Sequence, residues 1–504
     1  MRTLKSLRRR SRLWLLALAA ASVVLLAALA DGAGTAAAHT YYLSPSGNDH
    51  SVGTSLAHAW RTLARASRLR PRPGDRILLQ GGASFAGTLR VIVAGRGNPR
   101  APVVIGSYGP GDATIEAGGS SAVEVLDSSG VRVERLVLRG SGASTNTGSG
   151  VLVLNDLRGG VALRAIRVAG VSAEGFGFAG IAVYGAPRDG SQSGYRGVAV
   201  NDCQANANRY YGIYVNGVED PQTSRYANAE VSIRRCSAAR NEGNPDYPQK
   251  HSGNGIFMGD VDGGVISEST AHDNGALNSC EDCGPAGIWA ANAHAVRIEH
   301  DESYSNHSGP GGHDGDGFDL DGGTTDCVLQ YDYSHDNDGA GLMVYGYAGA
   351  PHSVDGNTIR YDISRDDGRR GGYPGILLSG NGQAVTDSAV YGNSVALTPP
   401  RGGSPAAFEA VGSVSASVRS NAFSTRGGLP LVRVLAPQPG LTFQGNDYWT
   451  AGEPALFEYG SATFGSLDAW SSATGQERGA GGPLGSSVAP EGFSGSAGSA
   501  GAGA

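Results

Sequence analysis

Four aspartates lie within eight residues of one another, in the stretch DGDGFDLD. They are Asp314, Asp316, Asp319 and Asp321, and the last two alternate with apolar residues as in a β-strand. Aspartate is rare in strands, and like charges that are held close together repel each other. A set of oxygen-only ligands with few histidines nearby favours Ca²⁺ over Zn²⁺. The spacing therefore predicts that these four carboxylates bind calcium.

Two simpler interpretations stay open for the same residues. The stretch could be an acidic turn in solvent, or it could hold a calcium ion that only staples a loop. An EF-hand does not fit, because its twelfth position counted from Asp314 is Thr325 rather than an acid. A calcium β-roll would need several copies, and GDGFDL occurs once.

A repeated motif led by glycine determines the expected fold. Its copies are GVLV at 150, GIAV at 180, GIYV at 212, GIFM at 255, GIWA at 287, GFDL at 317, GLMV at 341 and GILL at 375. A second element of each unit ends in an asparagine or aspartate, which gives the column Asn208, Asn241, Asn274, Asn306, Asn337, Asp367 and Asn393. Short units with strand alternation predict an all-β protein, a right-handed parallel β-helix with one coil per repeat. The asparagine column then forms an internal hydrogen-bonded ladder.

The repeat also gives each side chain a direction. The first and third residues after each glycine are apolar and point inward, so the second and fourth point outward. In the GFDL unit the inward residues are Phe318 and Leu320, and the outward ones are Asp319 and Asp321. The two acids should therefore leave one strand on the same outer face, about 7 Å apart at their Cα atoms.

An aromatic row is expected beside these acids. The outward columns place Tyr214, Phe257 and Trp289 on successive coils before Asp319, and Tyr345 on the coil after Asp321. Such a row could bind a sugar chain, because aromatic rings stack on the apolar faces of sugars. Alternatively, an inserted loop could cover the rings as a small second core, for which the 43 residues between the glycines at 212 and 255 leave room.

The chain divides into three parts. Residues 1–38 read as an export signal, with a basic start, the uncharged apolar run 13–30 and Ala36-Ala37-Ala38 before a mature start near His39. The alternative is an uncleaved membrane anchor. Residues 39–478 form the β-helix, with a short capping helix within 55–69 and aromatic residues of 447–478 closing the other end. The glycine-, alanine- and serine-rich tail 479–504 is expected to be disordered.

The composition of the chain limits the binding partners and the cellular environment that we expect. The formal charge of −7 argues against nucleic acid, and the export signal predicts a secreted, extracellular protein with no membrane association after cleavage. We expect a monomer. The five cysteines then face an oxidising environment, and Cys280-Glu-Asp-Cys283 is expected to form a local disulfide rather than a metal or redox motif.

Laid out in this way, the chain resembles secreted bacterial β-helix proteins of the pectin lyase-like superfamily, and most of all family nine polysaccharide lyases and their uncharacterised relatives. The resemblance spans nearly the whole mature chain and includes YYLSPSGNDHSVGTS, RPRPGDRILLQGG, GDGFDLDGG and YSHDNDGAGLMVYGY. The family's Asp-Gly-aromatic-Asp-Leu pattern is similar to residues 316–320, but the acid that precedes it in the family is Gly315 here. Asp314 or Asp321 could replace that acid, and Glu281 or Asp282 could add a further ligand.

The resemblance implies a calcium-dependent lyase that cleaves an acidic, uronate-containing polysaccharide by β-elimination, with a lysine as the base. No lysine follows Lys250 in this chain, so Lys250 is the first candidate, Arg369 and Arg370 come next, and His313 and His335 are others. Two other functions are open. One is a glycoside hydrolase that uses acids among Asp316, Asp319 and Asp321, and the other is a glycan-binding surface protein with a structural cation.

Overall fold

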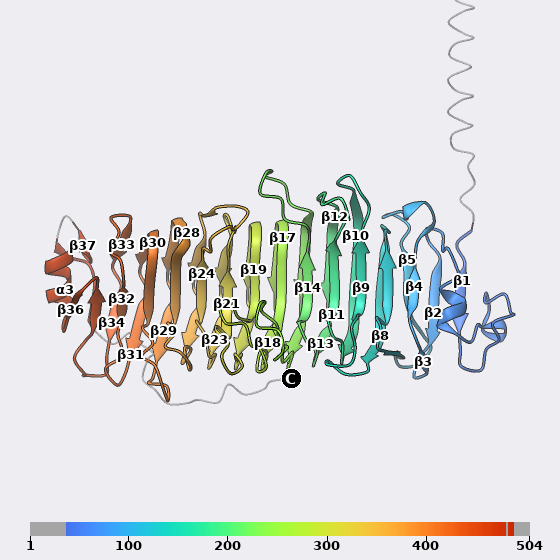
Figure 1. Cartoon of the computed structure of the whole chain (residues 1–504), viewed down its shortest axis with the longest axis horizontal. Helices are drawn as coiled ribbons and strands as arrows, with labels where there is room; N and C mark the ends of the chain where they lie inside the picture. The colour runs from blue at the N-terminus through green and yellow to red at the C-terminus, as the bar shows by residue number, and fades with distance from the viewer. Residues whose placement is uncertain (1–36, 480–481, 488–504) are drawn as a thin grey trace, which may run out of the picture. The chain divides into compact units, whose positions relative to one another are not determined.

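Inward-facing apolar residues of successive repeats stack directly above one another and hold the coils together. Ile213, Ile256 and Ile288 occupy the same ladder position and are fully buried, as are the other residues of this column. The computed structural model describes residues 37–479 and 482–487. The unit that begins at Thr40 is a right-handed parallel β-helix of about 11 turns (Figure 1), which confirms the expected fold.

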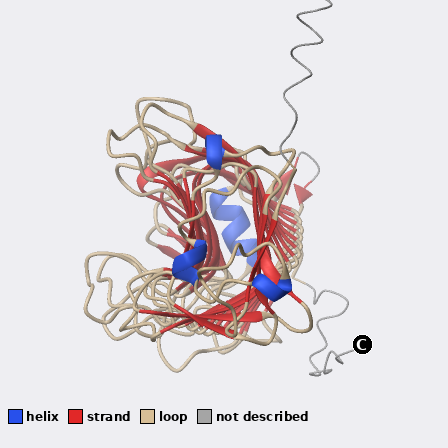
Figure 2. Cartoon of the chain, turned by 90° about the vertical axis from the view of Figure 1, so that its right-hand side faces the viewer, coloured by secondary structure: helices blue, strands red, loops and turns tan. Residues whose placement is uncertain are grey.

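Strands of successive coils pair in parallel and form three ladders around one apolar interior (Figure 2). The first ladder carries the glycine-led repeats. It contains β4 (Leu89–Val91), β7 (Val123–Leu126), β9 (Ser149–Asn155), β11 (Ala179–Gly185), β14 (Tyr211–Asn216), β17 (Asn254–Ser267), β19 (Ala286–Glu299), β21 (Asp316–Leu320), β24 (Leu342–Tyr345), β28 (Ile376–Tyr391), β30 (Phe408–Arg419), β32 (Val432–Val434) and β35 (Phe457–Tyr459).

The other two ladders complete each coil. The second contains β1 (Thr40–Leu43), β2 (Arg76–Gln80), β5 (Val103–Tyr108), β8 (Val131–Gly140), β10 (Ala162–Glu174), β12 (Gly194–Asn201), β15 (Asn228–Arg234), the second halves of β17 and β19, β22 (Val328–Gln330), β25 (Val354–Asp355), β26 (Thr358–Arg360), the later parts of β28 and β30, and β33 (Leu441–Gln444). The third contains β3 (Ser84–Ala86), β6 (Ala113–Gly118), the ends of β8 and β10, β13 (Gln204–Asn206), β16 (Ser237–Ala239), β18 (Thr270–His272), β20 (Glu302–Tyr304), β23 (Tyr333–His335), β27 (Ile363–Arg365), β29 (Ser394–Leu397), β31 (Ala422–Thr425) and β34 (Asp447–Trp449).

The predicted asparagine ladder is present, but it ends one residue earlier than expected. From Asn208 to Asp367, each backbone N–H and side-chain amide donates to the side-chain oxygen of the next member. Asn393 belongs to a second buried ladder instead, where its Oδ1 accepts the N–H of Asp362. The members of this second ladder are Ser269, Asp301, Asp332, Asp362, Asn393, Asn421, Asn446 and Glu477. The shorter final gap of 26 residues marks this change of ladder.

The N-terminal cap is less helical than expected. Residues 55–69 form a 3₁₀ turn, η1 (Leu56–His58), and a single α-helical turn, α2 (Leu63–Ala66). Trp60, Leu63 and Ala66 cover the first coil, whereas Leu56 is 61% exposed and does not contribute. The cap therefore depends on a few buried side chains rather than on a continuous amphipathic helix. A second 3₁₀ turn, η2 (Ala94–Arg96), lies between coils.

The aromatic C-terminal segment closes the last coil, as expected. β36 (Ala462–Phe464) pairs antiparallel with β35, and α3 (Leu467–Thr474) places Trp470 against Phe457, with ring centroids 4.7 Å apart. The ordered chain then continues past 479, where a disordered tail was expected. β37 (Arg478–Gly479) pairs with β38 (Gly482–Pro483), and the N–H of Tyr448 donates to the carbonyl of Ser486.

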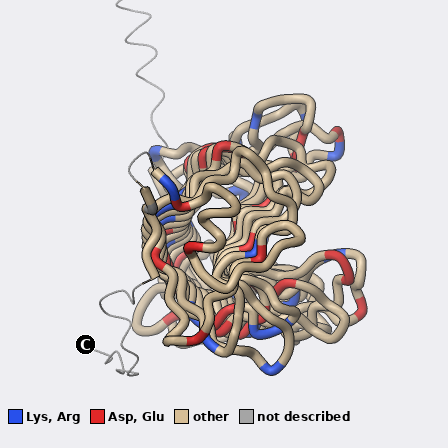
Figure 3. The backbone as a smooth tube through the Cα atoms, turned by 90° about the vertical axis from the view of Figure 1, so that its left-hand side faces the viewer, with Lys and Arg blue, Asp and Glu red and all other residues tan. Residues whose placement is uncertain are grey.

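Cys280 and Cys283 form the predicted local disulfide, and Cys203, Cys236 and Cys327 are buried free thiols. Across the described ranges, no helix is both long enough and apolar enough to span a membrane. The expected export signal falls on residues 1–38, of which 1–36 lie outside the described residues, as do 480–481 and 488–504 of the tail. Charged positions lie mainly on the corners and projecting loops of the coils (Figure 3).

Candidate functional site

β21 has the register that the sequence predicts. Phe318 and Leu320 are fully buried in the interior, while Asp319 pairs with Trp289 of β19 on one side and with Met343 of β24 on the other. Asp319 and Asp321 therefore leave the coil on its outer face. Contrary to a solvated acidic turn, however, the face is covered: Asp316 is 1% exposed and Asp319 is 4% exposed.

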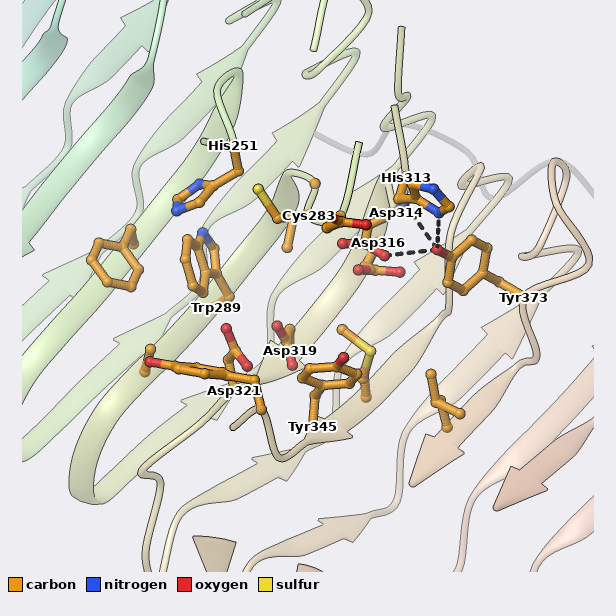
Figure 4. Close-up of a pocket in the computed structure, with 18 of the residues that line it drawn as sticks. His251, Cys283, Trp289, His313, Asp314, Asp316, Asp319, Asp321, Tyr345 and Tyr373 are labelled. Atoms are coloured by element: carbon orange, nitrogen blue, oxygen red, sulfur yellow. Dashed lines mark hydrogen bonds between the residues drawn. The ribbon is translucent and has the colours of Figure 1, made fainter. Parts of the chain in front are cut away.

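Loops from several coils enclose these acids in a cavity of about 720 Å³ (Figure 4). The loop 276–285, which the disulfide closes, brings Glu281 and Asp282 to the cavity, and the loop 346–353 brings Tyr347. Asp314, Asp316, Asp319 and Asp321 all line it, so the structure brings the four predicted acids together. Asp314 and Asp321 are partly exposed, whereas the other two lie deeper.

Each of the four carboxyl groups has different partners. Asp316 Oδ1 accepts the N–H of Ala340 at 2.5 Å, and Asp321 Oδ1 accepts the N–H of Gly322 at 2.7 Å. Asp314 Oδ1 accepts a hydrogen bond from the hydroxyl of Tyr373 at 2.9 Å. Asp319 Oδ1 has no hydrogen-bond partner among the residues described. The four acids are therefore not equivalent, and one of them has an unused buried acceptor.

Burial decides how these groups titrate. Burial raises the pKa of Asp316 and of Asp319 well above the usual range, and the charges of neighbouring aspartates raise both further. Burial also raises the pKa of Asp321 to about 7, although its bond from Gly322 opposes the shift. The pKa of Asp314 is raised by burial as well, but the hydrogen bond from Tyr373 lowers it. Burial therefore opposes ionisation at all four acids, and at Asp314 the hydrogen bond from Tyr373 offsets part of that effect.

The acids do not form a ready calcium site. Their all-oxygen chemistry suits calcium, but within the described part of the chain no group of three or more His, Cys, Asp or Glu side chains is placed to hold a metal ion. Gly315 occupies the position where lyases of family nine have a further acid, and it cannot be replaced easily. Its φ is +91°, and a Cβ there would lie 2.8 Å from the carbonyl carbon of His307. Position 315 therefore cannot supply the family's further acid, and calcium binding by the four aspartates stays a prediction.

The predicted bases do not reach the cavity. Lys250 is exposed on the loop before β17, and Arg369 donates to the carbonyl of Thr398. Arg370 binds the carbonyls of Ser308 and Gly309 on the outside of a neighbouring loop. No lysine or arginine of residues 37–479 or 482–487 lines the cavity. Among the other candidates, His313 lines it, whereas His335 lies in the third ladder against Tyr304.

The aromatic row is present, but it forms a covered wall. Tyr214, Phe257 and Trp289 follow one another in the ladder, and the rings of Phe257 and Trp289 lie 4.1 Å apart. Trp289 is only 5% exposed, because His251 from the inserted loop packs edge-on against it at 5.2 Å. Phe257 and Trp289 thus form a small second core, as in the alternative, while their rings still contribute to the wall of the cavity. Tyr345 is partly exposed and lines the cavity, as expected for a residue that contacts a ligand.

Sequence reasoning missed several residues that shape the site. Tyr373 reaches Asp314 from a loop 59 positions later, and Tyr347 and Glu219 arrive on other loops. Burial lowers the pKa of His251 to about 4, so its ring is neutral at neutral pH. None of these residues lies in a repeat, and their positions depend on loop paths. The sequence offered one indication of these cavity residues, the long insertion between residues 212 and 255, which contains Glu219 and His251.

Comparisons with known proteins establish the fold. No protein-family model matches the chain, and no curated protein matches it significantly. Among solved structures, a GH136 lacto-N-biosidase from Eubacterium ramulus is similar over 81% of this chain and 67% of its own, with 20% identity and a TM-score of 0.57. A mannuronan C-5 epimerase A-module from Azotobacter vinelandii (74% and 91% covered, 14% identity, TM-score 0.45) and a pectate lyase (77% and 80%, 15%, 0.35) are also similar. At these identities the likeness shows a shared β-helix fold.

Proposed function

We propose that the chain is a secreted glycoside hydrolase whose cavity cleaves a glycosidic bond with a pair of aspartates, Asp314 and Asp321. The observation that carries this proposal is the cavity itself, which presents carboxyl groups and aromatic rings but no lysine or arginine among its described lining residues. Hydrolysis of a glycosidic bond needs two carboxyl groups and no other base. The lacto-N-biosidase of the same fold is a precedent for this chemistry on a β-helix.

Asp314 and Asp321 are assigned as the pair because their carboxyl groups are the accessible ones. Both are partly exposed, while Asp316 and Asp319 line the cavity more deeply and are almost fully buried. Asp314 accepts a hydrogen bond from Tyr373, which favours a carboxylate. Asp321 receives only the N–H of its neighbour Gly322 and is surrounded by other acids, which favours the protonated form. Asp321 is therefore the general acid, and Asp314 is the ionised partner.

With this pair, hydrolysis of the glycosidic bond needs only water as a co-reactant. Asp321 donates its proton to the glycosidic oxygen as the bond from that oxygen to the anomeric carbon breaks. A water molecule adds to the anomeric carbon, and its proton returns to the carboxyl pair. The net reaction consumes one water and yields two sugars with hydroxyl ends, without an unsaturated product.

The test is product analysis with matched variants. Purified chain is incubated with neutral oligosaccharides and with uronate polymers, and both reducing ends and unsaturated products are measured. Asp321→Asn and Asp314→Asn should each lower the rate of reducing-end release at least 100-fold without a change in melting temperature. Asp332→Asn, which alters a buried acid of the side-chain ladder from Ser269 to Glu477, serves as the control and should keep activity. Unsaturated products from the unaltered chain would contradict the hydrolase assignment.

A calcium-dependent lyase acting on an acidic polysaccharide is the second candidate. It is favoured by the all-oxygen donor set of the four converging aspartates, which could bind calcium if a uronate carboxylate completed the site. This candidate predicts unsaturated products that disappear with EDTA and return with added calcium. A hydrolase of the kind proposed should be unaffected by EDTA, so the same assay separates the two.

A further inference from the structure

Asp319 lies at the floor of the cavity with one carboxyl oxygen that bonds to nothing. The residue is 4% exposed, and no group in the described ranges donates to its Oδ1. In Figure 4 its carboxyl group lies among the other labelled acids, between Asp321 and Asp316. A buried acceptor without a donor is destabilising, and native proteins rarely leave one unexplained. This oxygen is therefore placed to accept a hydrogen bond from a bound molecule.

The ladder gives the space above Asp319 apolar walls. Trp289 and Met343 are its neighbours on either side, and each belongs to a separate apolar cluster. Because adjacent strands lie about 4.8 Å apart, the Cα atoms of these two residues are roughly 9.6 Å apart. The aspartate thus interrupts an otherwise apolar outer row. A ring-shaped ligand could place its apolar faces toward these walls and a polar edge toward Asp319.

The charge of the lining selects against an anionic ligand. Seven carboxyl groups line the cavity, those of Glu219, Glu281, Asp282, Asp314, Asp316, Asp319 and Asp321, and no lysine or arginine of the described chain accompanies them. A uronate would bring a further carboxylate among these acids without a counter-charge. A hydroxyl group, in contrast, supplies the missing donor at no electrostatic cost.

We propose that Asp319 is a specificity-determining residue whose Oδ1 accepts a hydrogen bond from a hydroxyl group of an uncharged sugar unit, so that the cavity takes neutral glycans rather than uronates. This inference rests on the proposed function for its substrate class, but it concerns binding and not the chemical step. Sites built to hydrogen-bond a hydroxyl group discriminate strongly against ligands that lack it at that position, because the buried partner is then left unpaired. Uronates also carry ring hydroxyl groups, so their exclusion follows from the acidic lining, which offers no counter-charge to their carboxylate.

Binding is measured without turnover. The full chain carrying Asp321→Asn is titrated calorimetrically with neutral oligosaccharides of glucose, galactose, mannose, xylose and N-acetylglucosamine, and with oligogalacturonate and oligomannuronate. Asp319→Asn and Asp319→Leu are then added in the same background. Asparagine keeps an oxygen acceptor of the same shape, whereas leucine removes it. Asp332→Asn is the matched control for a buried acid outside the cavity. Melting temperatures report whether each variant folds.

At least one neutral oligosaccharide should bind at least tenfold more tightly than either uronate, with equal affinity in EDTA and in calcium. Asp319→Asn should keep that affinity within about fivefold, and Asp319→Leu should lose at least tenfold. Tighter binding of a uronate, no neutral ligand bound at millimolar concentration, or an Asp319→Asn variant as weak as Asp319→Leu would overturn the proposal. If these bindings hold but the unaltered chain, with Asp321 intact, releases no reducing ends from the same oligosaccharides, the proposed hydrolase fails while the binding role of Asp319 stands.

Discussion

The hydroxyl group of Tyr373 is the side-chain partner of Asp314. Tyr373 donates to its Oδ1 at 2.9 Å and accepts its backbone N–H at 3.3 Å, and His313 Nδ1 lies 3.5 Å from the same hydroxyl. Tyr373→Phe removes a donor that favours the carboxylate, so the pKa of Asp314 should rise. The acidic limb of the pH–activity profile should move to higher pH, and kcat should fall about tenfold. Kinetics across pH check this.

Tyr331→Phe is the control for that measurement, because Tyr331 is 50% exposed and lies outside the cavity lining. It should leave the profile unchanged. A Tyr373→Phe variant with an unshifted acidic limb and a lower melting temperature would show that Tyr373 is only a structural support for its loop.

At the scale of elements, the aromatic wall joins an inserted loop to the first ladder. Trp289 packs against Phe257 within the ladder and against His251 of the loop. Trp289→Ala should remove most of this packing and destabilise the protein by about 3–5 kcal/mol. Denaturant unfolding measures this loss. If Trp289→Ala keeps the stability of the unaltered chain and loses only ligand affinity, the interpretation of Trp289 as a sugar-stacking residue would be supported instead.

The asparagine ladder that begins at Asn208 ends in one acid, Asp367, where every other member is asparagine. Asp367 Oδ1 accepts from Asn337, and burial raises the pKa of Asp367 to about 6. A raised pKa means that the folded state binds the proton of Asp367 more tightly than the unfolded state does. The contribution of this proton to the free energy of unfolding is therefore complete below about pH 4 and is lost as the pH rises through 6. Asp367→Asn should therefore be more stable than the unaltered chain by roughly 2–3 kcal/mol at pH 8, and nearly equal to it at pH 4.

Thermal or denaturant unfolding at both pH values checks that expectation. The same comparison with Asp366→Asn, an exposed-corner acid that accepts from Thr398, isolates the effect of burial. A difference between Asp367→Asn and the unaltered chain that does not depend on pH would show that ionisation of Asp367 is not the cause.

At the scale of the whole β-helix, the last coil must be covered, because an open strand ladder invites association with other chains. Trp470 of α3 is fully buried against Phe457, Phe443 and Tyr448. Trp470→Ala should uncover part of the interior, lower the free energy of unfolding by about 3–5 kcal/mol and promote association. Light scattering should show a monomer for the unaltered chain and larger species for the variant.

Trp449→Ala is the matched control, since Trp449 is only partly buried and contacts Arg426 at the surface. It should remain monomeric. If Trp470→Ala is equally monomeric and stable, the end of the solenoid is protected by something other than α3.

The repeat pattern of the sequence was sufficient to predict the coil. Alternation after each glycine places Ile256 and Ile288 inside and Asp319 outside, because a strand sends successive side chains to opposite faces and each coil repeats the pattern of the last. The asparagine ladder, with members such as Asn274, was also predictable from the sequence, because asparagine recurs at a nearly constant interval. These are local, periodic signals, and the convergence of the four aspartates followed from them.

The surroundings of those aspartates depend on contacts between segments that are far apart in the sequence. The loops that carry Lys250 and Arg370 reach the cavity through His251 and Tyr373, but Lys250 and Arg370 themselves do not line it. Tyr373 lies 59 residues beyond Asp314, to which it donates a hydrogen bond. Trp289 was correctly placed on the outer face, yet a loop covers it there. Loop paths have no period and follow from packing between distant segments, so no spacing in the sequence specifies them. For that reason the position of the acids was predictable, but their burial, their partners and the charge of their cavity were not.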